Sequence, residues 1–125
     1  MIKQDALELN GDWQLIYING PHISFNELYR LRKPHISFRS DQQSVTGNTG
    51  CNNFRGTIQV EGNKIRFSEM LVVTKKACID AHGELLFLEK LKNTYTWEIS
   101  DGKLLELMTN NITVMHFVKA SFSNI

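Results

Sequence analysis

Short runs of alternating apolar and polar residues, separated by turn residues, make up most of this chain. The first run, residues 11–20, places Trp13, Leu15 and Tyr17 on one face of an expected strand, with apolar residues also on the other face. Later runs predict hairpins that turn at Ser40–Gln43 and at Glu61–Asn63. Three final strands are expected, with turns at Asp101–Gly102 and at Asn110–Asn111.

One segment has helical rather than strand periodicity. In residues 81–93, Leu85, Leu88 and Leu91 recur at helical spacing, and Glu84 lies in the expected first turn. Residues 21–34 lie between two prolines and fit either a helical turn or a wrapped loop, and residues 70–78 are an apolar run less clearly typical of a strand.

These elements predict one mainly β (α+β) domain over residues 1–125. About eight antiparallel strands with one main helix favour a closed or nearly closed barrel, because a twisted sheet of this size hides its edges by curling. The helix is expected to cover one end or one flank.

Composition narrows the range of functions. The chain has 125 residues and a formal net charge of +1, so broad electrostatic binding to nucleic acid is not expected. No apolar run approaches the length of a membrane span, and the start has no signal-peptide pattern. The expected location is therefore the cytoplasm, or the cell envelope if a leader was removed upstream of Met1.

The stretch "SVTGNTGCNNFRG", Ser44 to Gly56, is the most unusual part of the sequence. It lacks the Lys-Ser/Thr and the following helix of a phosphate-binding loop. Cys51 as a nucleophile would need a nearby base, and the histidines form no recognisable motif with it: His22, His35, His82 and His116. A metal site would need Cys51, Cys78 and two histidines to converge without any metal-ligand spacing. No catalytic residue, metal or cofactor is predicted.

A conformational role fits this stretch better. Gly47, Gly50 and Gly56 allow backbone angles closed to other residues, and Gly56 is expected to mark a bulge or a close backbone approach. Asn52 can bond neighbouring backbone groups, and Phe54 is the expected apolar anchor as the chain re-enters the sheet.

The segment "TGCNNFRG", Thr49 to Gly56, resembles the T-G-C-N-x-F-x-G signature of META domains, the family of the heat-shock protein HslJ. "LNGDWQL" resembles the family's opening strand, "TKKAC" its T-x-M-A-C segment, and "ELLFLEKL" its helix. The resemblance covers about residues 9–118 and has one departure, Lys76 in place of an apolar Met.

The resemblance implies a mostly β domain of bacterial envelope, lipoprotein-like or stress-response proteins, with no agreed catalytic activity. It also implies that Cys51 and Cys78 are neighbours, either bonded or buried as free thiols. A bond would stabilise the fold by about 3–4 kcal/mol in the loop-entropy account, whereas a reducing cytosol would keep the thiols.

Two functions follow as expectations. The first is a non-enzymatic, monomeric HslJ-like domain that acts by binding an unknown protein or small-molecule partner, or by a structural role. The alternative is small-molecule or peptide binding in the barrel mouth, with Trp13, Tyr17, Tyr95 and Trp97 lining a cavity rather than filling the core.

One basic segment is also notable. "YRLRKPH" gathers Tyr29, Arg30, Arg32, Lys33 and His35, which we interpret as a solvated loop rather than a nucleic-acid contact.

Overall fold

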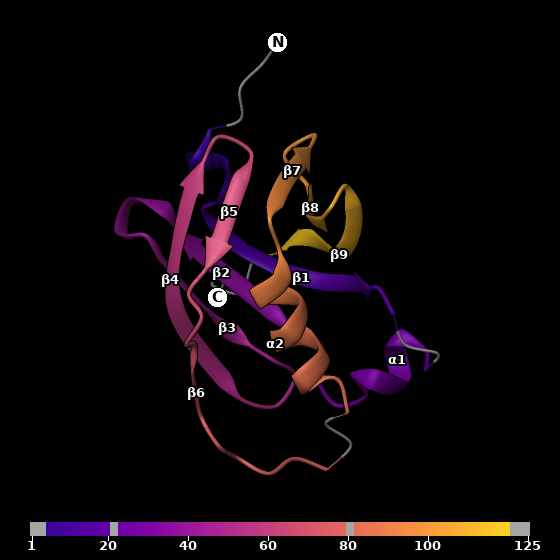
Figure 1. Ribbon diagram of the computed structural model, residues 1–125. Helices are drawn as coiled ribbons and strands as arrows, with labels where there is room; N and C mark the ends of the chain where they lie inside the picture. The colour runs from indigo at the N-terminus through magenta and orange to yellow at the C-terminus, as the bar shows by residue number, and fades with distance from the viewer. Residues whose placement is uncertain (1–4, 21–22, 80–81, 121–125) are drawn as a thin grey trace.

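The computed structural model describes residues 5–20, 23–79 and 82–120. The chain forms a closed antiparallel β-barrel with one main helix laid across its lower part (Figure 1). This confirms the predicted mainly β fold class.

Nine strands form in chain order: β1 (Gly11–Ile18), β2 (His35–Arg39), β3 (Ser44–Asn48), β4 (Asn53–Glu61), β5 (Lys64–Phe67), β6 (Val72–Val73), β7 (Thr96–Ser100), β8 (Leu104–Thr109) and β9 (Ile112–Ala120). The helical elements are η1 (Ala6–Leu9), α1 (Phe25–Leu28), η2 (Ser40–Gln42) and α2 (Glu84–Asn93), with η1 and η2 as 3-10 turns.

Eight of the strands close into the barrel. The order β3-β2-β1-β9-β8-β7-β5-β4 is completed by pairing of β4 with β3. Strand β6 lies outside this closed order and pairs with Phe54 and Arg55 in the first half of β4. Strand β5 pairs with the second half of β4, residues 58–61. The predicted hairpin turns at residues 40–43, 61–63, 101–102 and 110–111 all lie between paired strands.

The contact between β5 and β7 is the narrowest strand pairing around the barrel. Only Lys64 and Thr96 pair there in register. The Trp97 indole N–H crosses the contact and donates to the Gly62 carbonyl oxygen at 3.0 Å. Trp97 therefore both fills the interior and joins the two halves of the sheet.

Large side chains fill the barrel interior. The fully buried ones include both tryptophans, three phenylalanines and several aliphatic residues: Trp13, Trp97, Phe38, Phe87, Phe117, Leu9, Leu15, Ile36, Ile58, Ile65, Leu91 and Leu105. Helix α2 contributes Phe87, whose ring centroid lies 5.8 Å from that of Phe54 and 6.4 Å from that of Phe117. The helix thus completes the core by packing Phe87 and Leu91 against the barrel side chains.

Helix α2 differs from its expected pattern in one respect. Phe87 and Leu91 face the core, whereas Leu85 is 80% exposed. The helix begins after Gly83, so residues 82–83 of the expected segment 81–93 are not helical, and Ala81 lies outside the described residues.

Candidate functional site

The signature loop, defined here as residues 47–56, contains the connection from β3 to β4 and folds back on itself. Thr49 N–H donates to the Asn52 carbonyl oxygen at 2.8 Å, and Gly50 N–H donates to the Asn48 side-chain oxygen at 2.8 Å. The Thr49 hydroxyl oxygen accepts from the backbone N–H groups of Cys51 (3.2 Å) and Asn52 (2.9 Å). Three polar side chains of this loop are nearly inaccessible to solvent, namely Asn48, Thr49 and Asn52. Because buried polar groups need partners, these bonds make the loop a stable element.

Asn52 joins the loop to two distant segments. Its side-chain oxygen accepts from the Lys76 backbone N–H at 2.7 Å and the Thr74 hydroxyl at 2.8 Å. Its amide nitrogen donates to the Lys76 carbonyl oxygen at 3.1 Å and to a Glu84 carboxylate oxygen at 2.9 Å. Two donor and two acceptor positions are thereby used, which is the full capacity of an amide side chain.

Glu84 links the same network to the first turn of α2. Its Oε2 atom also accepts from the Thr49 hydroxyl at 2.6 Å. The sequence indicated Glu84 only as a first-turn carboxylate, so its contact with Asn52 was missed. No local spacing signals a contact between residues this far apart in the chain.

A disulfide completes this arrangement. Cys51 and Cys78 are bonded, with their Cα atoms 5.9 Å apart, so the structure has the bonded one of the two states that the sequence left open. A sulfur in this bond carries no thiolate, and Cys51 in this state is therefore no nucleophile. We call the bonded set Thr49, Cys51, Asn52, Thr74, Lys76, Cys78 and Glu84 the clamp.

The structure explains how Lys76 can replace the apolar Met of the family pattern. Lys76 takes part in the clamp through its backbone N–H and carbonyl groups, and its side chain is exposed. A charged side chain is accommodated there because the contacts to Asn52 do not involve it.

Two glycines of the loop are required by close approaches. A Cβ atom at Gly47 would collide with the His35 carbonyl oxygen and the Phe54 ring. Gly50 has φ of +99° and lies against the Arg32 carbonyl oxygen, 3.0 Å from where its Cβ would be. Gly56, expected at a bulge or a close backbone approach, is in regular pairing with Val45, and it is the Leu71 side chain that packs against it.

The four aromatic candidates divide into two pairs. Trp13 and Trp97 are fully buried, and the Trp13 indole N–H donates to the Leu9 carbonyl oxygen at 2.8 Å. Tyr17 and Tyr95 are 42% and 52% exposed, so placing them in the core or a barrel cavity was wrong. A register shift in β1 between Leu15 and Tyr17 turns Tyr17 outward, and Tyr95 precedes β7.

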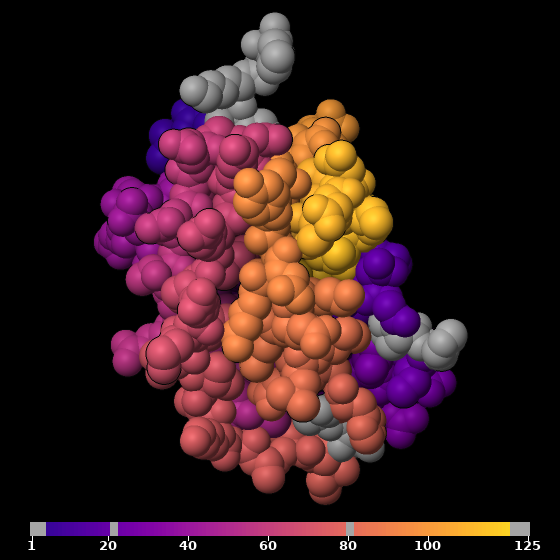
Figure 2. All heavy atoms as spheres, in the orientation of Figure 1, coloured from indigo at the N-terminus to yellow at the C-terminus, as the bar shows by residue number. Residues whose placement is uncertain are grey.

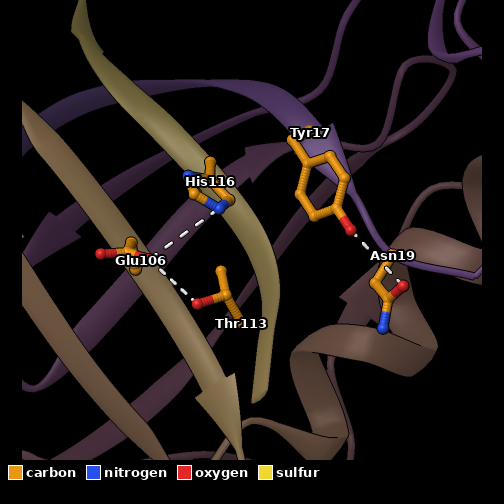
Figure 3. Close-up of polar contacts among 5 residues, drawn as sticks. All are labelled: Tyr17, Asn19, Glu106, Thr113 and His116. Atoms are coloured by element: carbon orange, nitrogen blue, oxygen red, sulfur yellow. Dashed lines mark hydrogen bonds and ion pairs between the residues drawn. The ribbon is translucent and has the colours of Figure 1, made fainter. Parts of the chain in front are cut away.

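Tyr17 belongs instead to a polar cluster on the outer face of β1, β8 and β9 (Figure 3). Its ring stands perpendicular to that of His116, with centroids 5.1 Å apart. His116 Nε2 lies 3.8 Å from Glu106 Oε1, which also accepts from the Thr113 hydroxyl at 2.9 Å. The ionisable groups of this cluster lie on β1, β8 and β9, whereas Cys51 lies in the connection between β3 and β4.

The other histidines stand apart from one another. His35 is half-buried on β2, and burial lowers its pKa, an effect that Asp12 opposes and Arg32 reinforces. His82 is exposed, and His22 lies outside the described residues. Within the described ranges, no three His, Cys, Asp or Glu side chains are arranged to hold a metal ion.

The basic segment is not a fully solvated loop, since Tyr29 and Pro34 are buried and His35 is half-buried in β2. Tyr29 is 5% exposed, and its hydroxyl donates to the Gly83 carbonyl oxygen at 3.0 Å. Burial raises the pKa of Tyr29 above its usual range. Arg30, Arg32 and Lys33 are exposed.

Grooves lie on the outside of the barrel wall. One of about 440 Å³ runs along β4 and β6, between Phe54, Arg55, Val72 and Val73. Another of about 520 Å³ lies by the β4–β5 hairpin and includes Tyr95, Lys64 and Arg66. A third hollow, of about 460 Å³, lies by Asp12, Ser37 and Arg39. These hollows are open to a ligand, whereas the large side chains listed above occupy the interior.

The closed eight-stranded barrel, the helix that completes its core and the clamp define a class of small β-domains. The chain belongs to the META domain family, whose profile matches residues 5–122. The resemblance predicted from the signature segments is therefore confirmed.

Solved structures share this fold. An NMR structure of a protein from Burkholderia xenovorans matches with a TM-score of 0.69 and 19% identity, covering 92% of this chain and 85% of the other. A crystal structure of a DUF4847 family protein from Bacteroides vulgatus matches with a TM-score of 0.65 and 19% identity, covering 92% and 97%. At these identities the likeness shows the fold alone. Comparison with curated proteins gives no match.

Within the described part of the chain, no helix has the length and apolar character needed to span a membrane.

Proposed function

We propose that this META domain is a non-enzymatic module of the bacterial cell envelope or stress response that acts by binding a partner through its outer surface. The observation that carries the proposal is the Cys51–Cys78 disulfide within the clamp. Disulfides persist in oxidising compartments such as the bacterial periplasm and are rare in the cytosol. The bond therefore supports a location outside the cytoplasm.

The clamp also supports a non-enzymatic role. Two polar groups of the signature are the Asn52 amide and the Thr49 hydroxyl. Both are buried and hydrogen-bonded to other parts of the fold. Because their hydrogen-bonding positions are occupied by partners within the fold, these groups stabilise the structure and are not available to bind a substrate. The packed interior leaves the outer surface as the place for interactions.

The test is complementation of a strain that lacks the gene, grown at raised temperature and with antibiotic. The main variant combines Tyr17→Phe, Glu106→Gln and His116→Gln, which removes the acid–base groups of the exposed cluster at nearly constant volume. A second variant carries His35→Gln and His82→Gln. Both are expected to restore growth as well as the unaltered protein.

Asn52→Ala is the destabilised control, because the loss of its hydrogen bonds is expected to lower the stability of the fold and the amount of folded protein in the cell. Circular dichroism and expression level separate folding from function in each variant. A well-folded cluster or histidine variant that fails to restore growth, together with a turnover that the same substitution abolishes, would overturn the non-enzymatic assignment.

A further inference from the structure

Two exposed segments meet at the end of the barrel where α1 and the connection from β6 to α2 lie, at the lower end of Figure 1. One follows α1, and the other precedes α2 and continues into its first turn. Together they carry five cations and three aliphatic side chains, which we call the basic end: Arg30, Arg32, Lys33, Lys75, Lys76, Leu31, Ile79 and Leu85.

Contacts between the segments place them side by side. Arg30, Leu31, Arg32 and Ile79 border one small hollow together with Gly50 and Glu84. The Lys76 backbone is tied to Asn52, and Asn52 is tied to Glu84, the residue before Leu85. The disulfide at Cys78 anchors the second segment to the signature loop. The clamp thus holds the second segment, and the bond from the Tyr29 hydroxyl to the Gly83 carbonyl oxygen holds the first segment beside it.

The charge of this surface is net positive, because its five cations outnumber the three carboxylates on or next to these segments in the sequence, those of Glu27, Asp80 and Glu84. All five cations are exposed, whereas the Glu84 carboxylate is half-buried and accepts hydrogen bonds from Thr49 and Asn52. Glu27 on α1 is the exposed carboxylate next to the first segment. The whole chain has a formal charge of only +1, so the basic end is balanced by acidic residues elsewhere and the molecule carries a directional charge asymmetry.

The aliphatic side chains between these cations are unusually exposed. Leu31 is 67% exposed, Ile79 81% and Leu85 80%. A solvated loop does not need large apolar side chains beside its charges, whereas a surface that enters a membrane interface uses both.

We propose that the basic end docks on an anionic lipid membrane. Arg and Lys side chains would contact headgroup phosphates, and Leu31, Ile79 and Leu85 would enter the boundary with the acyl chains. The inference rests on the proposed binding role and names its surface and partner.

Two observations favour lipid over single-stranded nucleic acid and over a small anionic ligand. Proteins that bind single-stranded nucleic acid stack bases on aromatic side chains, but Tyr29, the aromatic residue of this segment, is buried against Gly83. The hollow between the segments has a volume of about 10 Å³, which is close to that of one water-sized probe, so a small anionic ligand has no pocket there. An extended face of charges and aliphatic groups remains, and a membrane fits it.

The experiment is flotation of the full, oxidised chain with vesicles of phosphatidylcholine alone or with 30% phosphatidylglycerol. Binding is expected only to the anionic vesicles and is expected to weaken with added salt. Lys75→Gln with Lys76→Gln should weaken binding about 30-fold, since each cation near an anionic surface contributes about fivefold in affinity. The matched control, Lys64→Gln with Lys103→Gln in the hairpins at the opposite end (Figure 1), should change it less than about twofold.

The aliphatic contribution has its own pair of variants. Ile79→Ser with Leu85→Ser should weaken vesicle binding about tenfold or more, because these side chains lose their contact with the acyl boundary. Leu7→Ser with Ile112→Ser removes similarly exposed side chains elsewhere and should have little effect. Circular dichroism checks that each variant is folded.

Three results would overturn the inference: no preference for anionic vesicles, equal weakening by both lysine pairs, or an equally tight complex with a single-stranded oligonucleotide that the aliphatic variant leaves unchanged. Restored growth of the deletion strain alongside absent vesicle binding would reject this surface and leave the binding role itself standing.

Discussion

At the residue scale, Asn52 is the centre of the clamp. The residue is 3% exposed, and its side chain bonds both backbone groups of Lys76, the Thr74 hydroxyl and the Glu84 carboxylate. Removing the amide would take away all four bonds at once, although Glu84 would keep its bond from the Thr49 hydroxyl and Thr74 its bond from the Asn53 N–H. Each such bond contributes about 1 kcal/mol, and a bond to a charged group contributes more.

Asn52→Ala is therefore expected to lower the free energy of unfolding by about 3 kcal/mol or more. Urea denaturation followed by tryptophan fluorescence measures the change. Asn26→Ala, at an exposed position of α1, is the control and should change stability by less than about 0.5 kcal/mol. Equal stabilities for the two variants would contradict the role given to Asn52.

A second residue-scale prediction concerns His35. Because burial lowers its pKa in the folded state, the unfolded chain binds this proton more tightly than the folded chain. Its contribution to stability is full above the ordinary histidine pKa of about 6.5 and is lost as pH falls through the lowered folded pKa.

The fall in unfolding free energy between pH 7 and pH 5 should therefore be smaller in His35→Gln than in the unaltered protein. Urea titrations at a series of pH values give the comparison, and His82→Gln, at an exposed position, serves as the control. Identical slopes for the His35 variant and the unaltered protein would show that His35 does not contribute.

At the scale of elements, the clamp fixes the segment between β6 and α2, which has little regular structure of its own. Residues 74–79 follow a two-residue strand, and their exposed side chains contribute little burial. Their position depends on the disulfide and on the bonds of Asn52.

Replacing both Cys51 and Cys78 by alanine should destabilise the fold by about 3–4 kcal/mol, because the bond closes a loop across a sequence separation of 27 residues. Addition of reductant to the unaltered protein should shift its urea midpoint in the same direction. The double variant should not respond to reductant, and an unaltered protein that also fails to respond would contradict the bond's structural role.

The positions of the hairpins were predicted correctly from the sequence. Turn residues located each hairpin, since Asp101-Gly102 and Asn110-Asn111 favour the positive φ values that the structure has there. Strict alternation failed in β1, because the shift between Leu15 and Tyr17 inserts one extra residue and reverses which side chains point outward. A bulge of this kind depends on the partner strand β9 and leaves no mark in the local pattern.

At the scale of the whole molecule, the central feature is a barrel whose interior holds large, fully buried side chains. The two tryptophans lie on β1 and β7, which are separated by β9 and β8 in the sheet, and neither is exposed at all. Their indole groups are hydrogen-bonded to backbone carbonyls of Leu9 and Gly62, so each is fixed in place.

This packing predicts blue-shifted tryptophan emission in the native protein and almost no quenching by acrylamide or iodide. Full quenching should appear only in denaturant. Strong native-state quenching would instead indicate an open interior and would revive ligand binding in the barrel mouth.

The candidate site could be predicted only in part at this scale. The signature loop, the pairing of Cys51 with Cys78 as one of two states, and the buried tryptophans followed from the sequence and the family resemblance. The contact of Glu84 with Asn52, and the meeting of the two basic segments, depend on tertiary packing across more than thirty residues of chain, which no local pattern encodes.

The most direct test of the account is the state of the two cysteines in the protein as its own cells make it. Cells are quenched with acid, their thiols are alkylated without reduction, and the purified protein is weighed by intact mass spectrometry. A clamp closed in an oxidising compartment predicts no added alkyl groups before reduction and two after it. Two alkylated cysteines before reduction would contradict both the bonded clamp and the envelope location.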